Sequence, residues 1–566
     1  MFAQSQNITK DANNVIYGPF KEISIIDGLG TTLFNCMKKQ GNKIAQIDAI
    51  SGQKRTYSEL LDRCIGTCVY MQSKGIKPND KVTICSYNHL DAFVPFVGGL
   101  FAGAVIISTD PRLNLLDTVY ILKQIRPNIL FVSENAIDLI ENSLERSDVA
   151  AEIVVFGNSQ KYVEFKTINF RDYEESFCPH VVENINATAV INFSSGTTGL
   201  PKGVCLSHYA LLGRTLLSID QMVNSIFLSS STLYWISGVI NFLCGTLSNS
   251  TLVVIPEFDK IQIWDWIETY KVTVMFLASF QLITLIKNNR QVDVDVSSVK
   301  IVLTGGNIIS KEQMLKIRSL FPSSAVMLGY GLTETIAVCM SLDPLSDEIN
   351  LKTYRNKPNS IGRPQPCCAY KVIDIETNRN LGPNQIGEMC IKTDFQMNGY
   401  YNNDLSIWDS EGFIKTGDLV YYDEDFSFYY VDRVKEMLRY QSCHISPAYL
   451  ETIISNHPAV KNVVVIGKLH PIDGHHPLAV VEKVEPVSEE EIINLVANEV
   501  ADTHRLRGGV KFIDKIPVEA QSGSSGINRK HKCSDSESSS DDRDYLLRYT
   551  LSSEGEESFS GISKES

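Results

Sequence analysis

Short apolar segments alternate with helically spaced segments over about the first 430 residues of the chain. Four of the apolar segments predict strands, at residues 81–87, 104–109, 128–134 and 152–158. Their apolar residues run on without alternating polar positions, which is typical of strands covered on both faces. Helical spacing between them then predicts parallel or mixed sheets packed against helices, the α/β class.

A different pattern begins after Val431. Ser446-Pro447 predicts a helix start, because proline suits the first helical turn. Residues 461–468 and 478–484 predict strands, and Ser488 with Glu491 has the spacing of a capping box. These elements predict a compact α+β unit of about 100 residues, close to a common domain size.

The pattern therefore predicts a large N-terminal α/β domain of packed sheets and helices followed by a small α+β domain. The Ser/Asp/Glu-rich end has too few apolar residues for a core and is predicted to be disordered. The predicted divisions are an N-terminal domain (1–431), a hinge (432–433), a C-terminal domain (434–530) and an acidic tail (531–566).

Composition narrows the function classes. The net charge of −14 argues against a general nucleic-acid binder, which needs a basic face. The 13 cysteines contain no CxxC pair, so we expect reduced thiols in an intracellular protein and no disulfide framework. The longest apolar run, around residues 92–108, is shorter than the roughly 20 residues of a membrane span, so we expect a buried helix and no transmembrane segment.

Residues 194–203, SSGTTGLPKG, combine hydroxyl groups, glycines and one lysine directly after a predicted strand at 189–194. Hydroxyl and backbone N–H donors next to a positive charge suit phosphate oxygens. A flexible surface loop is the alternative. The sequence is not a Walker A loop, since Pro201 precedes the lysine and Gly203 follows it. We therefore predict a phosphate-binding loop.

Three further segments support a nucleotide site. GYGLTET (329–335) offers an aromatic ring, a hydroxyl and a carboxylate, and the carboxylate of Glu334 suits Mg²⁺. TGD (416–418) places a carboxylate after a tight turn, where ribose hydroxyls can donate to it. Asp432-Arg433 lies at the predicted domain junction. Each segment alone could be an ordinary turn or surface ion pair.

Together these segments resemble the adenylate-forming superfamily, which includes acyl-CoA synthetases, peptide-synthetase adenylation domains and beetle luciferases. The resemblance covers about residues 20–530, and ADTHRLRGGVKFIDKIP (501–517) is most similar to the insect acyl-CoA synthetase and luciferase branch. It implies ATP, Mg²⁺ and coenzyme A as cofactor and co-substrates, a carboxylic acid as substrate, and a C-terminal domain that rotates between two half-reactions.

The resemblance also implies roles for individual residues. Catalytic roles fall to Lys202 and Thr333 on the phosphates and to Glu334 on Mg²⁺, while Asp432 is the hinge and Arg439 and Ser442 serve the thioester step. The implied nucleotide-binding residues are Ser194, Ser195, Gly196, Thr197, Thr198, Gly199, Gly305, Gly306, Asn307, Tyr330, Gly331, Asp418 and Arg433.

One departure from the family concerns PVEAQSGSSGINRK (517–530). Relatives carry a lysine here that neutralises charge during adenylation, but this chain places Gly526 or Ser524 at that position, depending on the alignment. Removal of a cation that acts in the transition state costs orders of magnitude in rate. The sequence therefore predicts reduced adenylation with nucleotide binding retained.

Three functions follow from these residues. The first is an ATP-dependent acyl-CoA synthetase for a fatty or aryl acid. The second is an adenylation-impaired relative that binds nucleotide or acyl ligand, and the third, less favoured, is a luciferase-type monooxygenase. The chain ends in KES without a peroxisomal tripeptide, so we expect the cytoplasm, with the peroxisome as the alternative. Serines in the acidic tail are candidates for phosphorylation or partner binding.

Residues 470–477, HPIDGHHP, raise the question of a metal site. A solvated loop is the favoured interpretation, because the ligands do not follow a fixed helical or hairpin spacing.

Overall fold

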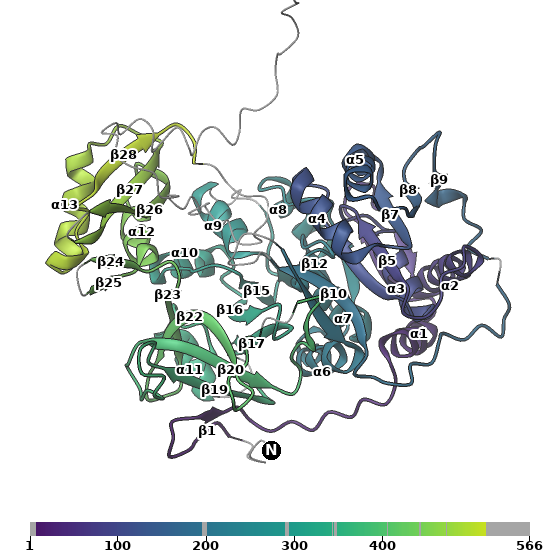
Figure 1. The fold of residues 1–566 in the computed structure, drawn as a ribbon, viewed down its shortest axis with the longest axis horizontal. Coiled ribbons are helices and arrows are strands. Elements are labelled where there is room, and N and C mark those ends of the chain that lie inside the picture. The colour runs from purple at the N-terminus through teal and green to yellow at the C-terminus, as the bar shows by residue number, and fades with distance from the viewer. Residues whose placement is uncertain are drawn as a thin grey trace, which may run out of the picture. The chain divides into compact units, whose positions relative to one another are not determined.

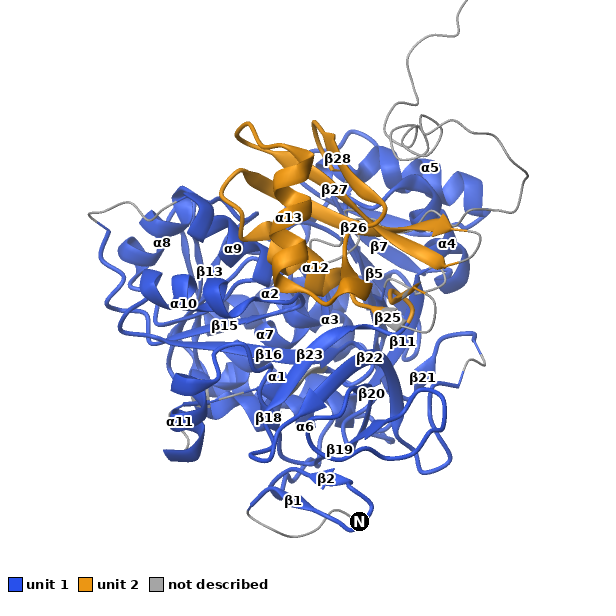
Figure 2. Ribbon diagram, turned by 90° about the vertical axis from the view of Figure 1, so that its left-hand side faces the viewer, with its two compact units in different colours: residues 1–434 blue, residues 435–566 orange. Residues whose placement is uncertain are grey.

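The computed structural model describes two compact units, residues 1–434 and 435–566, coloured separately in Figure 2. The division falls one residue after the predicted hinge residues 432–433. Within these units the described residues are 7–171, 173–194, 201–288, 294–341, 343–344, 348–403, 406–440, 443–470 and 473–516. None of their helices is long and apolar enough to cross a membrane.

The first unit contains an eight-stranded sheet that includes the predicted strands. β5, β6, β7, β8 and β10 form parallel neighbours, and β11 is antiparallel to β10. The central strands are buried along nearly their whole length, as their continuous apolar runs predict. In order across the sheet the strands are β21 (Gly399–Tyr400), β11 (Lys202–Ser207), β10 (Thr188–Ser194), β6 (Val105–Thr109), β5 (Lys81–Cys85), β7 (Ile129–Ser133), β8 (Glu152–Phe156) and β9 (Val163–Glu164).

A nine-stranded sheet also has a parallel centre with antiparallel edges. Its strands in order are β18 (Arg363–Pro364), β17 (Ala337–Ser341), β16 (Ala325–Leu332), β15 (Ile301–Gly305), β14 (Val274–Phe276), β12 (Ile226–Ser229), β13 (Thr251–Val254), β3 (Ile44–Asp48) and β4 (Lys54–Thr56). The third sheet is antiparallel, in the order β1 (Thr9–Lys10), β2 (Ile16–Tyr17), β19 (Cys368–Ile373), β20 (Gly387–Thr393), β22 (Ile414–Tyr422) and β23 (Phe428–Arg433).

Helices cover the sheets of the first unit, as Figure 1 shows for α4 and α5 beside β5 and β7. The run at 92–108 divides into the wholly buried helix α3 and the strand β6, which confirms a buried helix there. The helices are α1 (Leu29–Gln40), α2 (Tyr57–Ser73), α3 (Val94–Phe101), α4 (Leu115–Ile125), α5 (Ile137–Ser147), α6 (His208–Ser218), α7 (Ile236–Leu247), α8 (Gln262–Tyr270), α9 (Ser279–Asn288), α10 (Lys311–Leu320) and α11 (Glu348–Asn356).

The second unit packs two helices on a sheet of five strands. Its elements are β24 (Leu438–Tyr440), β25 (Cys443–Ile445), α12 (Pro447–Ser455), β26 (Val460–His470), β27 (Gly474–Lys483), α13 (Glu489–Glu499) and β28 (Gly509–Ile513). Ser446 caps α12 by accepting a hydrogen bond from the backbone N–H of Tyr449 at 3.1 Å, as predicted.

The predicted capping box of α13 is only half present. The Ser488 hydroxyl accepts from the backbone N–H of Glu491 at 3.1 Å. The Glu491 carboxylate instead lies 3.2 Å from the Nε2 atom of His457, which follows α12 in the chain. A tertiary partner has therefore replaced the local one, which sequence spacing alone could not indicate.

Candidate nucleotide site

Lys202 begins β11, directly opposite Ser194 at the end of β10. The strand pairing therefore places both ends of the predicted phosphate-binding loop side by side. The loop itself, with Ser195, Gly196, Thr197, Thr198 and Gly199, lies outside the described residues. Gly203 has a packing role, because a Cβ there would lie 3.0 Å from Ile191 and 3.2 Å from the Cβ of Tyr401.

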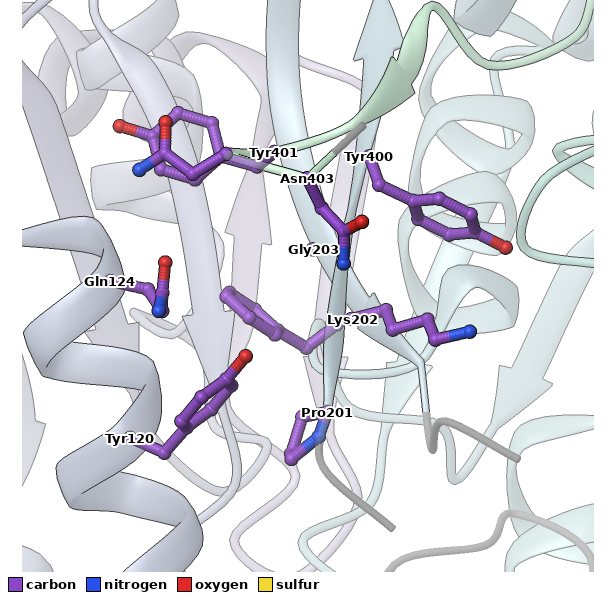
Figure 3. Close-up of a pocket in the computed structure, with 10 residues that line it drawn as sticks. Tyr120, Gln124, Pro201, Lys202, Gly203, Tyr400, Tyr401 and Asn403 are labelled. Carbon is purple, nitrogen blue, oxygen red and sulfur yellow. The ribbon is translucent and has the colours of Figure 1, made fainter. Parts of the chain in front are cut away.

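The Lys202 side chain lies beside Tyr400, with its ammonium nitrogen 5.3 Å from the centre of the Tyr400 ring. Both side chains line a pocket and project to the same side of β11, away from Tyr120 and Gln124 (Figure 3). An ammonium group at this distance from an aromatic face is attracted by the ring's negative potential. Tyr400 therefore helps to orient the predicted phosphate-binding cation.

Tyr400 also contacts Glu334, and so connects Lys202 in β11 to Glu334. Its hydroxyl donates a hydrogen bond of 2.8 Å to Oε1 of Glu334, and the backbone carbonyl of Glu334 accepts from the N–H of Met397 at 2.9 Å. Burial, together with the nearby Glu334 carboxylate, raises the pKa of the Tyr400 phenol, so the phenol stays protonated and can donate. Lys202, Tyr400 and Glu334 thus lie together, although Glu334 comes from the nine-stranded sheet and the other two from the eight-stranded sheet.

The predicted nucleotide-binding glycines at 305–306 and at 331 lie on or next to neighbouring strands of the nine-stranded sheet. β15 and β16 are parallel, and Gly305 pairs with Gly329 at their carboxyl ends. A Cβ at Gly305 would lie only 2.7 Å from the backbone oxygen of Gly329, so the close strand approach requires glycine. Gly306 and Asn307 follow in exposed positions, with Gly306 at a φ of 90°. This is the edge of a parallel sheet where α/β proteins place ligands.

Tyr330, Asp418 and Arg433 meet at the junction with the antiparallel sheet. The Tyr330 hydroxyl donates to Oδ2 of Asp418 at 2.6 Å, and Nε of Arg433 lies 2.8 Å from Oδ1 of Asp418. The Asp418 side chain is 1% exposed. Burial raises the pKa of this carboxyl, while Arg433 and Tyr330 oppose the rise; the ion pair with Asp418 raises the pKa of Arg433.

Asp418 was predicted to follow a tight turn, where its carboxylate could accept from ribose hydroxyls. Asp418 lies within β22, after Gly417 with a φ of 72°, and its carboxylate is enclosed by protein groups. Its Oδ1 atom nevertheless receives no hydrogen bond within the described part of the chain, since the Arg433 contact lacks hydrogen-bond geometry. The Arg433 guanidinium compensates the charge of this buried oxygen, and a ligand hydroxyl would add the hydrogen bond that Oδ1 lacks.

The remaining predicted residues are placed as follows. Thr333 and Glu334 lie in the turn between β16 and β17, and Gly331 is exposed near the end of β16. Asp432 is buried in β23, where its Oδ1 accepts from the N–H of Arg433 at 2.7 Å. Arg439 is in β24, opposite His444. The Arg439 side chain and Ser442, Ser524 and Gly526 lie outside the described residues.

Tyr400 is the residue that sequence reasoning missed. It belongs to the two-residue strand β21, which pairs with β11 almost 200 positions earlier in the chain. The local sequence GYY (399–401) contains a glycine and two aromatic residues but no spacing that points to Glu334. The β21–β11 pairing brings Tyr400 to the strand of Lys202, and the hydrogen bond from the N–H of Met397 to the carbonyl of Glu334 joins this segment to Glu334.

Comparison with known proteins agrees with these motifs. The AMP-binding enzyme family matches residues 33–401, and the AMP-binding enzyme C-terminal domain matches residues 449–523. The chain belongs to the AMP-binding enzyme family. Membership confirms the resemblance to the adenylate-forming superfamily and its insect luciferase-like branch, and it confirms the fold class.

Relatives of this AMP-binding family member carry several activities. Luciferin 4-monooxygenase of Nipponoluciola cruciata is 30% identical over 538 residues, covering 90% of this chain and 96% of that protein. 4-coumarate–CoA ligase 1 of Petroselinum crispum is 28% identical over 509 residues, covering 86% and 91%.

Two solved structures share the fold. The luciferase-like enzyme from the nonluminescent Zophobas morio mealworm is 34% identical with a TM-score of 0.70, covering 76% of this chain and 99% of that one. ATP-bound MatB from Rhodopseudomonas palustris is 21% identical with a TM-score of 0.77, covering 88% and 97%.

Proposed function

We propose that this AMP-binding family member is an acid–thiol ligase. It activates a fatty or aryl carboxylic acid with ATP and transfers the acyl group to coenzyme A. The observation that carries the proposal is the convergence of three motif segments, because Lys202, Glu334 and Asp418 are linked through Tyr400 and Tyr330 at the junction of three sheets. The relative named 4-coumarate–CoA ligase supports the same reaction class.

In the first half-reaction a carboxylate oxygen of the acid attacks the α-phosphorus of ATP, and the bond to pyrophosphate breaks. In the second, the thiol sulfur of coenzyme A attacks the acyl carbon and AMP leaves. Lys202 and Thr333 offset the charge that develops on the phosphate oxygens. Arg439 and Ser442 belong to the thioester step, and Asp432 is the hinge about which the C-terminal unit turns.

The residues fit the nucleotide and its metal ion. Oδ1 of Asp418, which is paired with Arg433 but accepts no hydrogen bond among the described residues, suits a ribose hydroxyl, and the ring of Tyr330 suits the adenine face. Glu334 offers a hard carboxylate ligand that Tyr400 holds in place. Mg²⁺, when bound there, neutralises phosphate charge.

A second candidate is an adenylation-impaired protein that binds nucleotide or acyl ligand. The sequence observation that favours it is glycine or serine where relatives have the adenylating lysine, at Gly526 or Ser524. Light production is not part of either proposal. The cytoplasm remains the predicted compartment, and the peroxisome is the alternative because one relative is named a peroxisomal OPC-8:0-CoA ligase.

The test is carboxylate-dependent ATP–pyrophosphate exchange across a panel of fatty and aryl acids, for the native chain and for Gly526→Lys. Native exchange supports the ligase, and the preferred acid gives the substrate class. Exchange only in Gly526→Lys supports the impaired form with an otherwise complete site. Absence of exchange in both, together with absence of ATP binding, refutes both candidates.

Glu334→Gln distinguishes the assigned site from contaminating activity. We expect at least a 100-fold loss of exchange, since a neutral amide is a poor ligand for Mg²⁺. Glu348→Gln is the matched control, because Glu348 is an exposed glutamate in the first turn of α11. Equal loss in both variants would contradict the site assignment.

A further inference from the structure

The second unit contains a histidine cluster that the proposed reaction does not use. β26 continues to His470 and β27 begins at Gly474, so these residues form a hairpin end. Residues 470 and 474–476 are therefore strand residues, and the prediction of a solvated loop is wrong for them. The register pairs His470 with Gly474 and Lys468 with His476.

This register sorts the three histidines by face. Successive side chains on a strand point to opposite faces of the sheet. His470 and His476 therefore share one face, whereas His475 pairs with Leu469 and lies on the other. Asp473 precedes Gly474 and directs its carboxylate to the face of His470 and His476.

One carboxylate oxygen lies between the two imidazoles. Oδ2 of Asp473 is 2.9 Å from Nε2 of His476 and 3.2 Å from Nδ1 of His470. One ligand atom from each of the three residues lies within 4.8 Å of the others. In a tetrahedral site with metal–ligand distances of about 2.0–2.1 Å, neighbouring ligand atoms are roughly 3.3 Å apart. The two short separations are already close to this value.

One hydrogen bond of the cluster involves an atom that would bind the ion. The backbone N–H of Asp473 donates to Nδ1 of His470 at 3.2 Å, so Nδ1 is an acceptor in this structure. A metal ion bound at Nδ1 takes over the single lone pair that this N–H now uses.

We propose that His470, Asp473 and His476 bind one divalent transition-metal ion of the zinc class. Two imidazole nitrogens and one carboxylate oxygen favour such an ion over Mg²⁺ or Ca²⁺, which prefer oxygen ligands alone. The side chains are 38%, 18% and 19% exposed, so the ion can enter from solvent and a water completes the fourth position. The ion joins the end of β26 to the start of β27.

Binding requires a local adjustment of the rings. The imidazoles of His470 and His476 stack with centres 4.2 Å apart and an angle of 14° between their planes. Lone pairs lie in the ring planes, so at least one ring turns about its terminal side-chain bond, a torsion with a broad energy minimum. The ring of Tyr440 lies 5.7 Å from His476, and Arg507 lies 4.5 Å from Tyr440. Arg507 and the exposed Lys468 lower the affinity for a cation without occupying the ligand set.

The test is Zn²⁺ binding to the full-length chain without nucleotide, by titration calorimetry and by metal analysis after dialysis. We expect one Zn²⁺ to be bound by the native chain, and at least tenfold weaker binding at this site in His470→Ala, His476→Ala and Asp473→Asn. His475→Ala is the matched control, since it removes a histidine from the same hairpin on the opposite face. It should bind as the native chain does.

Cobalt(II) provides a second readout that separates histidine from cysteine ligands. Visible d–d bands of a four-coordinate site without thiolate charge-transfer bands are expected, and they should disappear in His476→Ala. Matching thermal unfolding of metal-free native and variant chains establishes that the variants fold. Unchanged binding in the three ligand variants, or an equal loss in His475→Ala, would overturn the assignment.

Discussion

The buried bond between Tyr330 and Asp418 gives a measurable energetic prediction. Tyr330→Phe removes the hydroxyl that donates to Asp418 at 2.6 Å, while the carboxylate stays 1% exposed and is poorly screened by solvent. Hydrogen bonds to charged groups contribute about 1.5–3 kcal/mol. The Arg433 side chain is 43% exposed, so its ion pair with Asp418 compensates only in part.

A double-mutant cycle isolates this interaction. We expect Tyr330→Phe and Asp418→Ala to show a coupling free energy of about 1.5–3 kcal/mol in urea unfolding. Tryptophan fluorescence is the suitable probe, because all four tryptophans lie in the first unit and the signal excludes unfolding of the second. A coupling below about 0.5 kcal/mol would refute the reasoning, since it would place the bond among solvent-exposed interactions.

A matched cycle tests whether burial, and not distance, sets the magnitude. Tyr173 donates to Asp62 at the same 2.6 Å, but Asp62 is only half-buried. Tyr173→Phe with Asp62→Ala should therefore give a smaller coupling, about 0.5–1 kcal/mol. An equal or larger coupling at this second pair would contradict the assigned role of burial.

The remaining predictions concern acid stability, strand packing and metal dependence. Burial lowers the pKa of His208 to about 4 from 6.5, so the contribution of the neutral ring to the free energy of unfolding is present above pH 6.5 and is lost as the pH falls towards 4. Between pH 7 and pH 5, the free energy of unfolding in urea should therefore fall by about 2 kcal/mol less in His208→Gln than in the native chain. An equal fall in both chains would contradict this. Gly305→Ala should destabilise by about 1–3 kcal/mol because its Cβ meets backbone at 2.7 Å, whereas Gly382→Ala, with 3.8 Å of space, should have little effect in the same assay. Tyr400→Phe should raise the half-saturating Mg²⁺ concentration for exchange about three- to tenfold, since Glu334 loses its donor; an unchanged Mg²⁺ dependence would exclude this positioning role.

The sequence alone determined the features that depend on neighbouring residues. Continuous apolar runs predicted β5 to β8, and hydroxyl side chains at the right offsets predicted the caps of α12 and α13. The glycine-rich and TGD motifs also identified the family, because such combinations are rare by chance. Each of these signals lies within one short stretch of chain, so no knowledge of tertiary packing was needed.

The tertiary structure decided which separate stretches meet. Strand pairing brought Tyr400 to the strand of Lys202, tertiary hydrogen bonds joined Tyr400 and Met397 to Glu334, and packing of the antiparallel sheet brought Asp418 to Tyr330. It also redirected Glu491 to His457 and placed His470, Asp473 and His476 on one face of a hairpin. These contacts depend on strand register and side-chain burial over long sequence separations or across a turn, and no local periodicity records them.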